Sequence, residues 1–190
     1  MQSIPDFPVG PSSAWQDAQH VSVPEPYLRN WLLDTGSLTE RLQSMCRRFD
    51  LILLGQHPAQ PTDCERDVLP DKPLGGNWVI REVILCGDGQ PWVYARSVIC
   101  QALVDGELSQ LGQQPLGKVI FNDKRFSRSE FQLSYALAPD KLAPLIEPKD
   151  MYLWGRRSCF HYADHVMLVA ETFLPDAPAY RGVKNERMKS

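Results

Sequence analysis

The sequence predicts an α+β domain in which a single antiparallel β-sheet is flanked by helices. Two pairs of apolar runs, each joined by a short turn, predict two β-hairpins, and the strands of a hairpin pair antiparallel. The helical stretches do not alternate regularly with the strands, as they would around a parallel sheet. At 190 residues the chain has the size of one ordinary domain, so we expect residues 1–190 to fold as one unit.

The two ends of the chain differ from its middle. Residues 1–23 are rich in proline, serine and glycine, which predicts a loosely attached N-terminal arm. The motif PYLRNWLLD then predicts a short helix, and a second helix over Ser37–Arg48 opens with Ser37-Leu38-Thr39-Glu40. This is a capping box, in which serine and glutamate satisfy free amides reciprocally. Residues 181–190 predict a polar C-terminal tail.

Shorter elements are predicted between the helices and the hairpins. The motif LILLG predicts a short strand at residues 51–55. The proline-rich stretch 57–76 predicts a long loop, and loops of that length often act as lids over binding sites. Farther along, Glu107–Gln113 predicts a helical turn or two, and the motifs KVIF and FQLSY predict two short strands.

The hairpins supply the long strands of the predicted sheet. The first joins Asn77–Cys86 to Trp92–Cys100 through the turn GDGQP, and the second joins Leu153–Tyr162 to His165–Leu174 at Ala163-Asp164. A short turn between two apolar, β-rich runs is typical of a hairpin.

The composition excludes several classes of protein. A net charge of −3 argues against a general nucleic-acid-binding protein, which needs a basic surface to neutralise phosphates. The N-terminus has no basic segment followed by an apolar stretch, and no apolar run is long enough to cross a bilayer. We therefore expect a cytoplasmic protein without a membrane span. We also expect it to be a monomer.

Motifs for metals and common cofactors do not occur in the sequence. The four histidines lack zinc-binding spacing, and the G-x-S-x-G, P-loop and G-x-G-x-x-G motifs are missing, so we expect neither metal nor nucleotide cofactor. An odd number of cysteines without C-x-x-C spacing predicts reduced thiols in the core: Cys46, Cys64, Cys86, Cys100 and Cys159.

Arg81 is a lone charge on one face of a predicted strand. Strand alternation places it with Val79, Val83 and Leu85, while Glu82 lies on the other face. A buried charge is costly unless it is paired, so Arg81 forms an internal ion pair or binds a charged ligand. The planar guanidinium suits a carboxylate ligand in two-point contact.

Glu171 is the corresponding lone acid, on a face shared with Val169 and Phe173. An apolar setting favours the neutral form of a carboxyl, which makes Glu171 a candidate proton donor, proton acceptor or hydroxyl partner in a cavity. The residues alone favour a different interpretation, in which these charges have no ligand. Structural ion pairs would then form between Arg81 and Glu171, or would join Arg81 and Glu82 to other neighbours. Alternatively, one face of the sheet would be open to water. Arg156 and Arg157 alternate between faces, and we expect both to be exposed.

Four segments, taken together and in order, resemble the chorismate pyruvate-lyase family of ubiquinone biosynthesis. They are W-V-I-R-E-V-I-L-C-G-D-G-Q-P-W at 78–92, L-G-Q-Q-P-L-G-K-V-I-F at 111–121, L-W-G-R-R-S at 153–158 and A-E-T-F-L-P-D-A-P-A-Y at 170–180. The resemblance runs from about Tyr27 to Tyr180 and implies a chorismate lyase-like fold with the ligand enclosed beneath flaps.

The resemblance also implies a function: a cofactor-free lyase that converts chorismate to 4-hydroxybenzoate and pyruvate, the first step of ubiquinone biosynthesis. Arg81 would bind the ring carboxylate, and Glu171 would contact the hydroxyl, by orienting it rather than by acting as a base. The Leu116 amide would assist at the carboxylate. Leu38 replaces a methionine that is frequent in the family, and it would contribute through its backbone or its side chain.

A second class of function shares this fold. Regulatory domains of some transcription factors resemble the same lyases and bind small effectors without turning them over, so the fold alone does not separate the two. Such regulators carry an N-terminal helix-turn-helix domain. The residues before Tyr27 are too few and too rich in proline to form one, which favours the enzyme.

Overall fold

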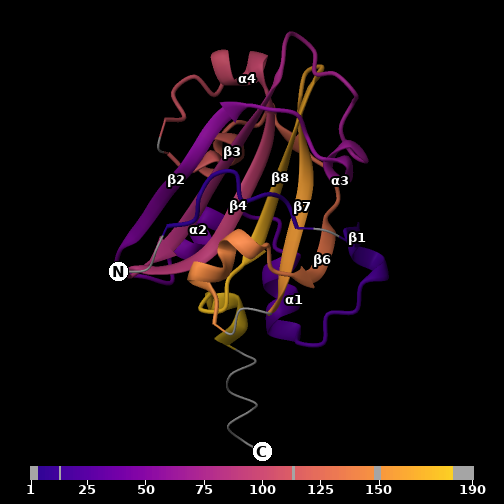
Figure 1. Cartoon of the computed structure of the whole chain (residues 1–190). Coiled ribbons are helices and arrows are strands. Elements are labelled where there is room, and N and C mark those ends of the chain that lie inside the picture. Colours follow the sequence, from indigo (N-terminus) through magenta and orange to yellow (C-terminus); the bar gives the residue numbers. More distant parts are fainter. Residues whose placement is uncertain (1–3, 13, 113, 148–150, 182–190) are drawn as a thin grey trace, which may run out of the picture.

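The computed structural model describes residues 4–12, 14–112, 114–147 and 151–181. Its centre is one eight-stranded sheet in the order β1-β6-β7-β8-β4-β3-β2, with β5 beside β7, and every paired strand is antiparallel (Figure 1). The strands are β1 (Gln16–Asp17), β2 (Phe49–Pro58), β3 (Trp78–Gly87), β4 (Gln90–Cys100), β5 (Ser127–Arg128), β6 (Gln132–Leu137), β7 (Tyr152–Tyr162) and β8 (His165–Phe173). The predicted α+β class with a single antiparallel sheet is confirmed.

Short helices connect and cover these strands. They are α1 (Pro26–Leu32), α2 (Leu38–Gln43), α3 (Asp63–Arg66), α4 (Gln101–Asp105) and α5 (Leu116–Asn122), with 3-10 turns η1 (Ala18–His20), η2 (Asp140–Leu145) and η3 (Pro178–Tyr180). None of these helices, which are all those found in the described ranges, is both long and apolar enough to span a membrane.

Both predicted hairpins are confirmed. Strands β3 and β4 meet at Asp88 and Gly89, whose φ angles of 50° and 80° are the two left-handed conformations of a type I′ turn. Strands β7 and β8 turn at Ala163. Strand β8 then inserts between β7 and β4, so the last strand in the sequence occupies the middle of the sheet.

Helices α1, α2 and α5 cover one face of the sheet. Apolar side chains from α1 and α2 pack there on Val83 of β3 and Phe173 of β8. Ser37 caps α2, because its Oγ accepts a hydrogen bond from the Glu40 amide at 3.3 Å. The helix ends at Gln43, earlier than the sequence predicted.

The N-terminal segment, α3 and η2 cover the opposite face. The segment crosses the sheet (indigo in Figure 1), and the amides of Val9 and Gly10 donate to the Glu82 carboxylate at 2.7 and 3.0 Å. Strand β1 extends the sheet at β6. The prediction of a loosely attached arm over residues 1–23 is therefore wrong for its described part, because a buried carboxylate holds the segment through its backbone amides.

Three local predictions need correction. The motif KVIF lies in helix α5, not in a strand, and Pro115 stands at its N-cap. Helix α4 precedes Glu107–Gln113, which contains turns up to Gly112. The loop over 57–76 contains α3, whose capping box pairs Thr62 with Glu65. Of the predicted polar tail over residues 181–190, all but Arg181 lies outside the described residues.

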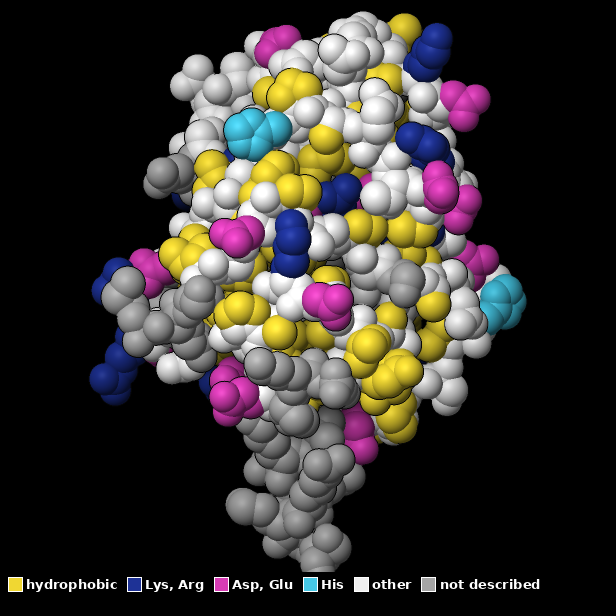
Figure 2. Space-filling model, viewed as in Figure 1, with side chains coloured by type: hydrophobic (Ala, Val, Ile, Leu, Met, Phe, Trp, Pro, Cys, Tyr) yellow, Lys and Arg dark blue, Asp and Glu magenta, His cyan; other side chains and the backbone are white. Residues whose placement is uncertain are grey.

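The face that Figure 2 shows mixes charges of both signs. Figure 2 shows acidic and basic side chains scattered among hydrophobic ones over the face that the N-terminal segment crosses.

All five cysteines are free thiols. Cys86, Cys100 and Cys159 are buried as predicted, whereas Cys46 and Cys64 are only partly buried. Within the described ranges, no group of three His, Cys, Asp or Glu is placed to hold a metal ion.

Candidate active site

A cavity lies between the sheet and helices α2 and α5. Its free volume of about 50 Å³ exceeds the roughly 10–15 Å³ that one water needs, so it is more than a packing gap. All four residues predicted for the site line it: Leu38, Arg81, Leu116 and Glu171. The other lining residues are mostly apolar, with Phe121, Phe131 and Phe160 among them.

Arg81 is held rigidly at one side of this cavity. Its side chain is buried, and Nη1 donates to Gln56 Oε1 at 2.8 Å and to the Gly112 carbonyl at 2.9 Å, while Nη2 donates to the Gln114 carbonyl at 3.1 Å. A guanidinium has five N–H groups. Nε–H and one hydrogen on Nη2 thus have no acceptor in the described part of the chain, and together they can bind a carboxylate at two points.

The charge of Arg81 is not neutralised by an acidic neighbour among the described residues. Burial lowers its pKa to about 10, which still leaves the group charged at neutral pH. A buried, charged and unpaired guanidinium attracts an anion strongly, because the ligand restores the interaction energy lost with water.

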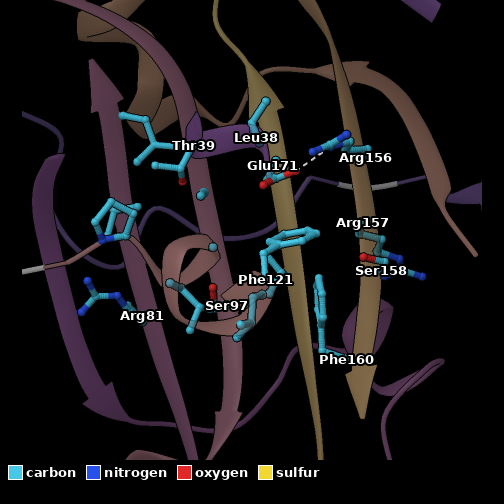
Figure 3. A pocket seen from close by; sticks show the side chains of 18 of the residues that line it. Leu38, Thr39, Arg81, Ser97, Phe121, Arg156, Arg157, Ser158, Phe160 and Glu171 are labelled. Atoms are coloured by element: carbon cyan, nitrogen blue, oxygen red, sulfur yellow. Dashed lines mark hydrogen bonds and ion pairs between the residues drawn. The ribbon is translucent and has the colours of Figure 1, made fainter. Parts of the chain in front are cut away.

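Glu171 lies across the cavity from Arg81 (Figure 3). The residues are on the same face, two strands apart, because Arg81 is opposite Ser97 on β4 and Glu171 is opposite Ala95. Neighbouring strands are about 4.8 Å apart, so roughly 10 Å of sheet separates the two backbones. The two side chains are not partners and face the same enclosed space.

Glu171 forms an ion pair with Arg156. Nε of Arg156 donates to Oε2 of Glu171 at 2.6 Å, and the residues are directly opposite each other on β7 and β8. The prediction of an apolar setting for this carboxyl is therefore wrong, because the Arg156 guanidinium lies directly beside it. Oε2 is fixed by this pair, whereas Oε1 has no partner within the described ranges and can contact a ligand.

Arg156 and Arg157 point to opposite faces of β7, as predicted, but neither is exposed. Arg156 also donates through Nη1 to the carbonyls of Trp31 and Asp34, at 3.0 and 2.8 Å. Arg157 donates on the far face to the Cys64 carbonyl at 2.6 Å. These internal acceptors replace water, which the sequence pattern could not indicate.

Glu82 forms a structural ion pair, one of the alternatives in the sequence analysis, on the other face of the sheet. Arg96 donates to Glu82 at 2.7 Å and to both carboxylate oxygens of Glu65 at 2.7 and 3.0 Å. Glu65 belongs to α3, and the whole stretch 57–76 contributes no residue to the cavity lining. The expected lid role of this stretch is therefore wrong for this cavity, which α2 and α5 cover instead.

Leu38 and Leu116 mark the starts of the two covering helices. Amides in the first turn of a helix lack intrahelical acceptors, so the predicted role of the Leu116 amide in carboxylate binding is geometrically available. Gly117 lets the helices approach closely, since a Cβ there would stand 3.1 Å from Thr39 Oγ1. The contributions of Leu38 and Leu116 to ligand binding remain predictions.

Sequence reasoning missed Arg128 and Phe131, which line the cavity from β5 and the segment after it. Neither stands in a long periodic strand, so no misplaced charge or broken alternation marked them. The only sequence feature that could have indicated a site role for them was their common position in the short motif SRSEF.

Sequence comparisons with known proteins agree on one family. A family model described as chorismate lyase matches residues 11–184. A probable chorismate pyruvate-lyase of Pseudoalteromonas atlantica is 46% identical over 191 residues, covering 95% of this chain and 96% of its own. A protein of the same description from Shewanella loihica is 37% identical over 179 residues, covering 90% and 92%.

Solved structures with a similar fold are more distant. The effector domain of PhnF from Mycobacterium smegmatis has a TM-score of 0.50 at 14% identity, covering 74% of this chain and 90% of that one. The C-terminal domain of the histidine utilization repressor from Pseudomonas syringae has a TM-score of 0.51 at 10% identity, covering 67% and 92%. At these identities the likeness shows the fold alone.

Proposed function

We propose, from the premise that this chain belongs to the chorismate lyase family, that it is a carbon–oxygen lyase that converts chorismate to 4-hydroxybenzoate and pyruvate. The enzyme acts without a cofactor, as a cytoplasmic monomer, at the first step of ubiquinone biosynthesis. The observation that carries the proposal is Arg81, a buried guanidinium without an acidic partner in the described chain, facing Glu171 across an enclosed cavity.

Arg81 and Glu171 suit the groups at the two ends of the chorismate ring. The free N–H groups of Arg81 bind the ring carboxylate at two points, and the Leu116 amide at the start of α5 assists. Glu171, held in place by Arg156, accepts a hydrogen bond from the ring hydroxyl at the other end. The apolar walls, with Val83 among them, exclude water and strengthen both contacts.

The chemical step needs orientation more than an added reagent. The bond between the ring carbon and the enolpyruvyl oxygen breaks, and the hydroxyl-bearing ring carbon loses its hydrogen, so the ring becomes aromatic. The methylene carbon of the leaving group gains one hydrogen, and the oxygen becomes the keto oxygen of pyruvate. All atoms of chorismate are thus recovered in the two products. Fixed charges at both ends of the ring hold the scissile bond in position, which is catalysis by positioning and preorganised electrostatics.

The direct test incubates the purified chain with chorismate, without added metal, and follows 4-hydroxybenzoate and pyruvate together. We expect equal amounts of both products. Arg81→Gln should reduce kcat/KM by at least a hundredfold, since it removes a charged two-point contact. Arg48→Gln, which changes an exposed arginine away from the cavity, is the matched control and should have no effect. Absence of both products with the wild-type chain would refute the lyase.

The same experiment separates the lyase from an effector-binding domain of the same fold. A non-catalytic relative would bind 4-hydroxybenzoate or chorismate and release it unchanged. The family match over residues 11–184 and the sequence identity to probable lyases over nearly the whole chain favour the enzyme.

A further inference from the structure

The cavity carries more positive charge than the contacts proposed so far use. The guanidinium groups of Arg81, Arg128 and Arg156 line it, and Glu171 is the one acidic residue in the lining, which consists of described residues. Arg157 also belongs to the lining, but its guanidinium donates to acceptors on the far face. Three cations against one carboxylate leave two positive charges in excess, the charge of a dianion.

Arg128 is the one of these three groups that has no hydrogen-bond acceptor among the described residues. Its guanidinium carbon lies 4.2 Å from the ring centre of Phe131 and 5.8 Å from that of Phe121, and both rings line the cavity. Across the described ranges it takes part in no hydrogen bond or ion pair, whereas Arg81 and Arg156 each donate three hydrogen bonds. The aromatic rings hold the guanidinium through cation–π contacts and leave its N–H edges open.

The surroundings of Arg128 favour an incoming anion. Burial lowers its pKa, and the positive charge of Arg156 lowers it further, while Glu171 acts in the opposite direction. A half-buried cation beside another cation is relieved by a negative ligand placed between them. Arg128 lies at the Glu171 end of the cavity, because its guanidinium and that of Arg156 both lie over the Phe131 ring. It is on the side away from Arg81, because β5 pairs with β7, which β8 and β4 separate from β3.

Chorismate presents a second carboxylate at this end. Its enolpyruvyl group is attached to the ring carbon next to the one that bears the hydroxyl. With the hydroxyl at Glu171 and the ring carboxylate at Arg81, the enolpyruvyl carboxylate must therefore lie near the Glu171 end. Its charge matches the second positive charge in excess.

We propose that Arg128 binds the enolpyruvyl carboxylate of chorismate. This inference rests on the proposed function and deepens it, because it gives the site a means of distinguishing its dianionic substrate from its ring product. When pyruvate leaves, the carboxylate at Arg128 leaves with it. 4-Hydroxybenzoate then keeps the contacts at Arg81, Leu116 and Glu171 but has none at Arg128.

The test compares one ligand that has the second carboxylate with one that lacks it. Arg128→Gln, Arg128→Lys and the control Arg125→Gln, which alters an exposed arginine outside the cavity lining, are titrated calorimetrically with two ligands. The ligands are 4-hydroxybenzoate and the unreactive dicarboxylate 3-(carboxymethoxy)-4-hydroxybenzoate. The kcat/KM for chorismate is measured on the same preparations.

We expect Arg128→Gln to weaken the dicarboxylate and to lower kcat/KM by about 10- to 100-fold, the loss of one charged hydrogen-bonding contact. Its affinity for 4-hydroxybenzoate should stay within about twofold of the wild type. Arg128→Lys should recover part of the loss, because it restores the charge without the planar fork, and Arg125→Gln should match the wild type.

Two results would overturn the role of Arg128: an unchanged affinity for the dicarboxylate, or an equal loss for both ligands, which would indicate a general structural effect. Failure of the lyase proposal has a different signature. If the wild-type chain bound both ligands but did not consume chorismate, the enzyme would be refuted, and the two dissociation constants would still decide whether Arg128 binds the second carboxylate.

Discussion

Replacing Arg96 by methionine should cost much of the stability of the fold. Arg96 is 4% exposed and lies between Glu65 and Glu82, which are 2% and 0% exposed. Methionine keeps most of the apolar stem but leaves two buried carboxylates without their cation. Breaking a buried pair costs about 3–5 kcal/mol. The amides of Val9, Gly10 and Thr62 still solvate the acids, so we expect a loss of about 4 kcal/mol at neutral pH.

The stability lost in Arg96→Met should become smaller as the pH falls. Burial by itself would raise the pKa of Glu65, but the hydrogen bonds and charge of Arg96 outweigh it and hold that pKa below its ordinary value. In the wild type this group stabilises the fold above its unfolded pKa, and that stability is lost as the pH falls through the folded pKa. Without Arg96, burial favours the neutral form of Glu65, so the variant loses less stability than the wild type on acidification.

Urea unfolding followed by tryptophan fluorescence measures both effects. The gap in the free energy of unfolding between wild type and Arg96→Met should narrow as the pH falls from 8 through the ordinary glutamate pKa of 4.5, and adding Glu65→Gln should recover part of it. The control Arg48→Met breaks an ion pair whose arginine is 78% exposed, and its loss should stay below about 1 kcal/mol. A gap under about 1 kcal/mol at neutral pH, or one that does not narrow, would refute this account of the ion-pair cluster.

Three further outcomes are expected at the cavity. Glu171→Gln should keep kcat for chorismate within about tenfold of the wild type if the residue orients the hydroxyl; a loss above about a hundredfold with intact binding would show that it acts as a base. Arg156→Lys should lower the free energy of unfolding by about 2 kcal/mol, because two buried carbonyls lose their donor; an unchanged urea midpoint contradicts this. Gly117→Ala should weaken 4-hydroxybenzoate about tenfold by pushing α5 from α2, and calorimetry should find the affinity restored when Thr39→Ala removes the opposing hydroxyl.

The long strands and the central pair of site residues could be predicted from the sequence because both depend on local order. Alternation along β3 and β8 fixed which side chains share a face with Arg81 and Glu171 before any tertiary contact was known. The turn at Asp88–Gly89 requires residues that tolerate positive φ, and the sequence supplies them. The resemblance to a family added the roles of these residues.

The features that the sequence did not predict depend on partners far along the chain. Arg156 is buried because the carbonyls of Trp31 and Asp34 accept its hydrogen bonds, and no local pattern reveals those acceptors. The motif KVIF has strong strand propensity, but tertiary packing on the cavity makes it helical in α5. The attachment of the N-terminal segment to Glu82 is equally non-local.

The position of β8 determines when the protein can acquire its cavity during synthesis. Strands β2, β3 and β4 emerge from the ribosome together and can pair at once, but the outer edge of β4 stays open until β8 arrives. Strand β7 waits for the same partner. A nascent chain that stalls before His165 therefore presents two open strand edges, which invite pairing with other chains. Arg81 is made early and Glu171 late, so the cavity forms only after β8 has been made.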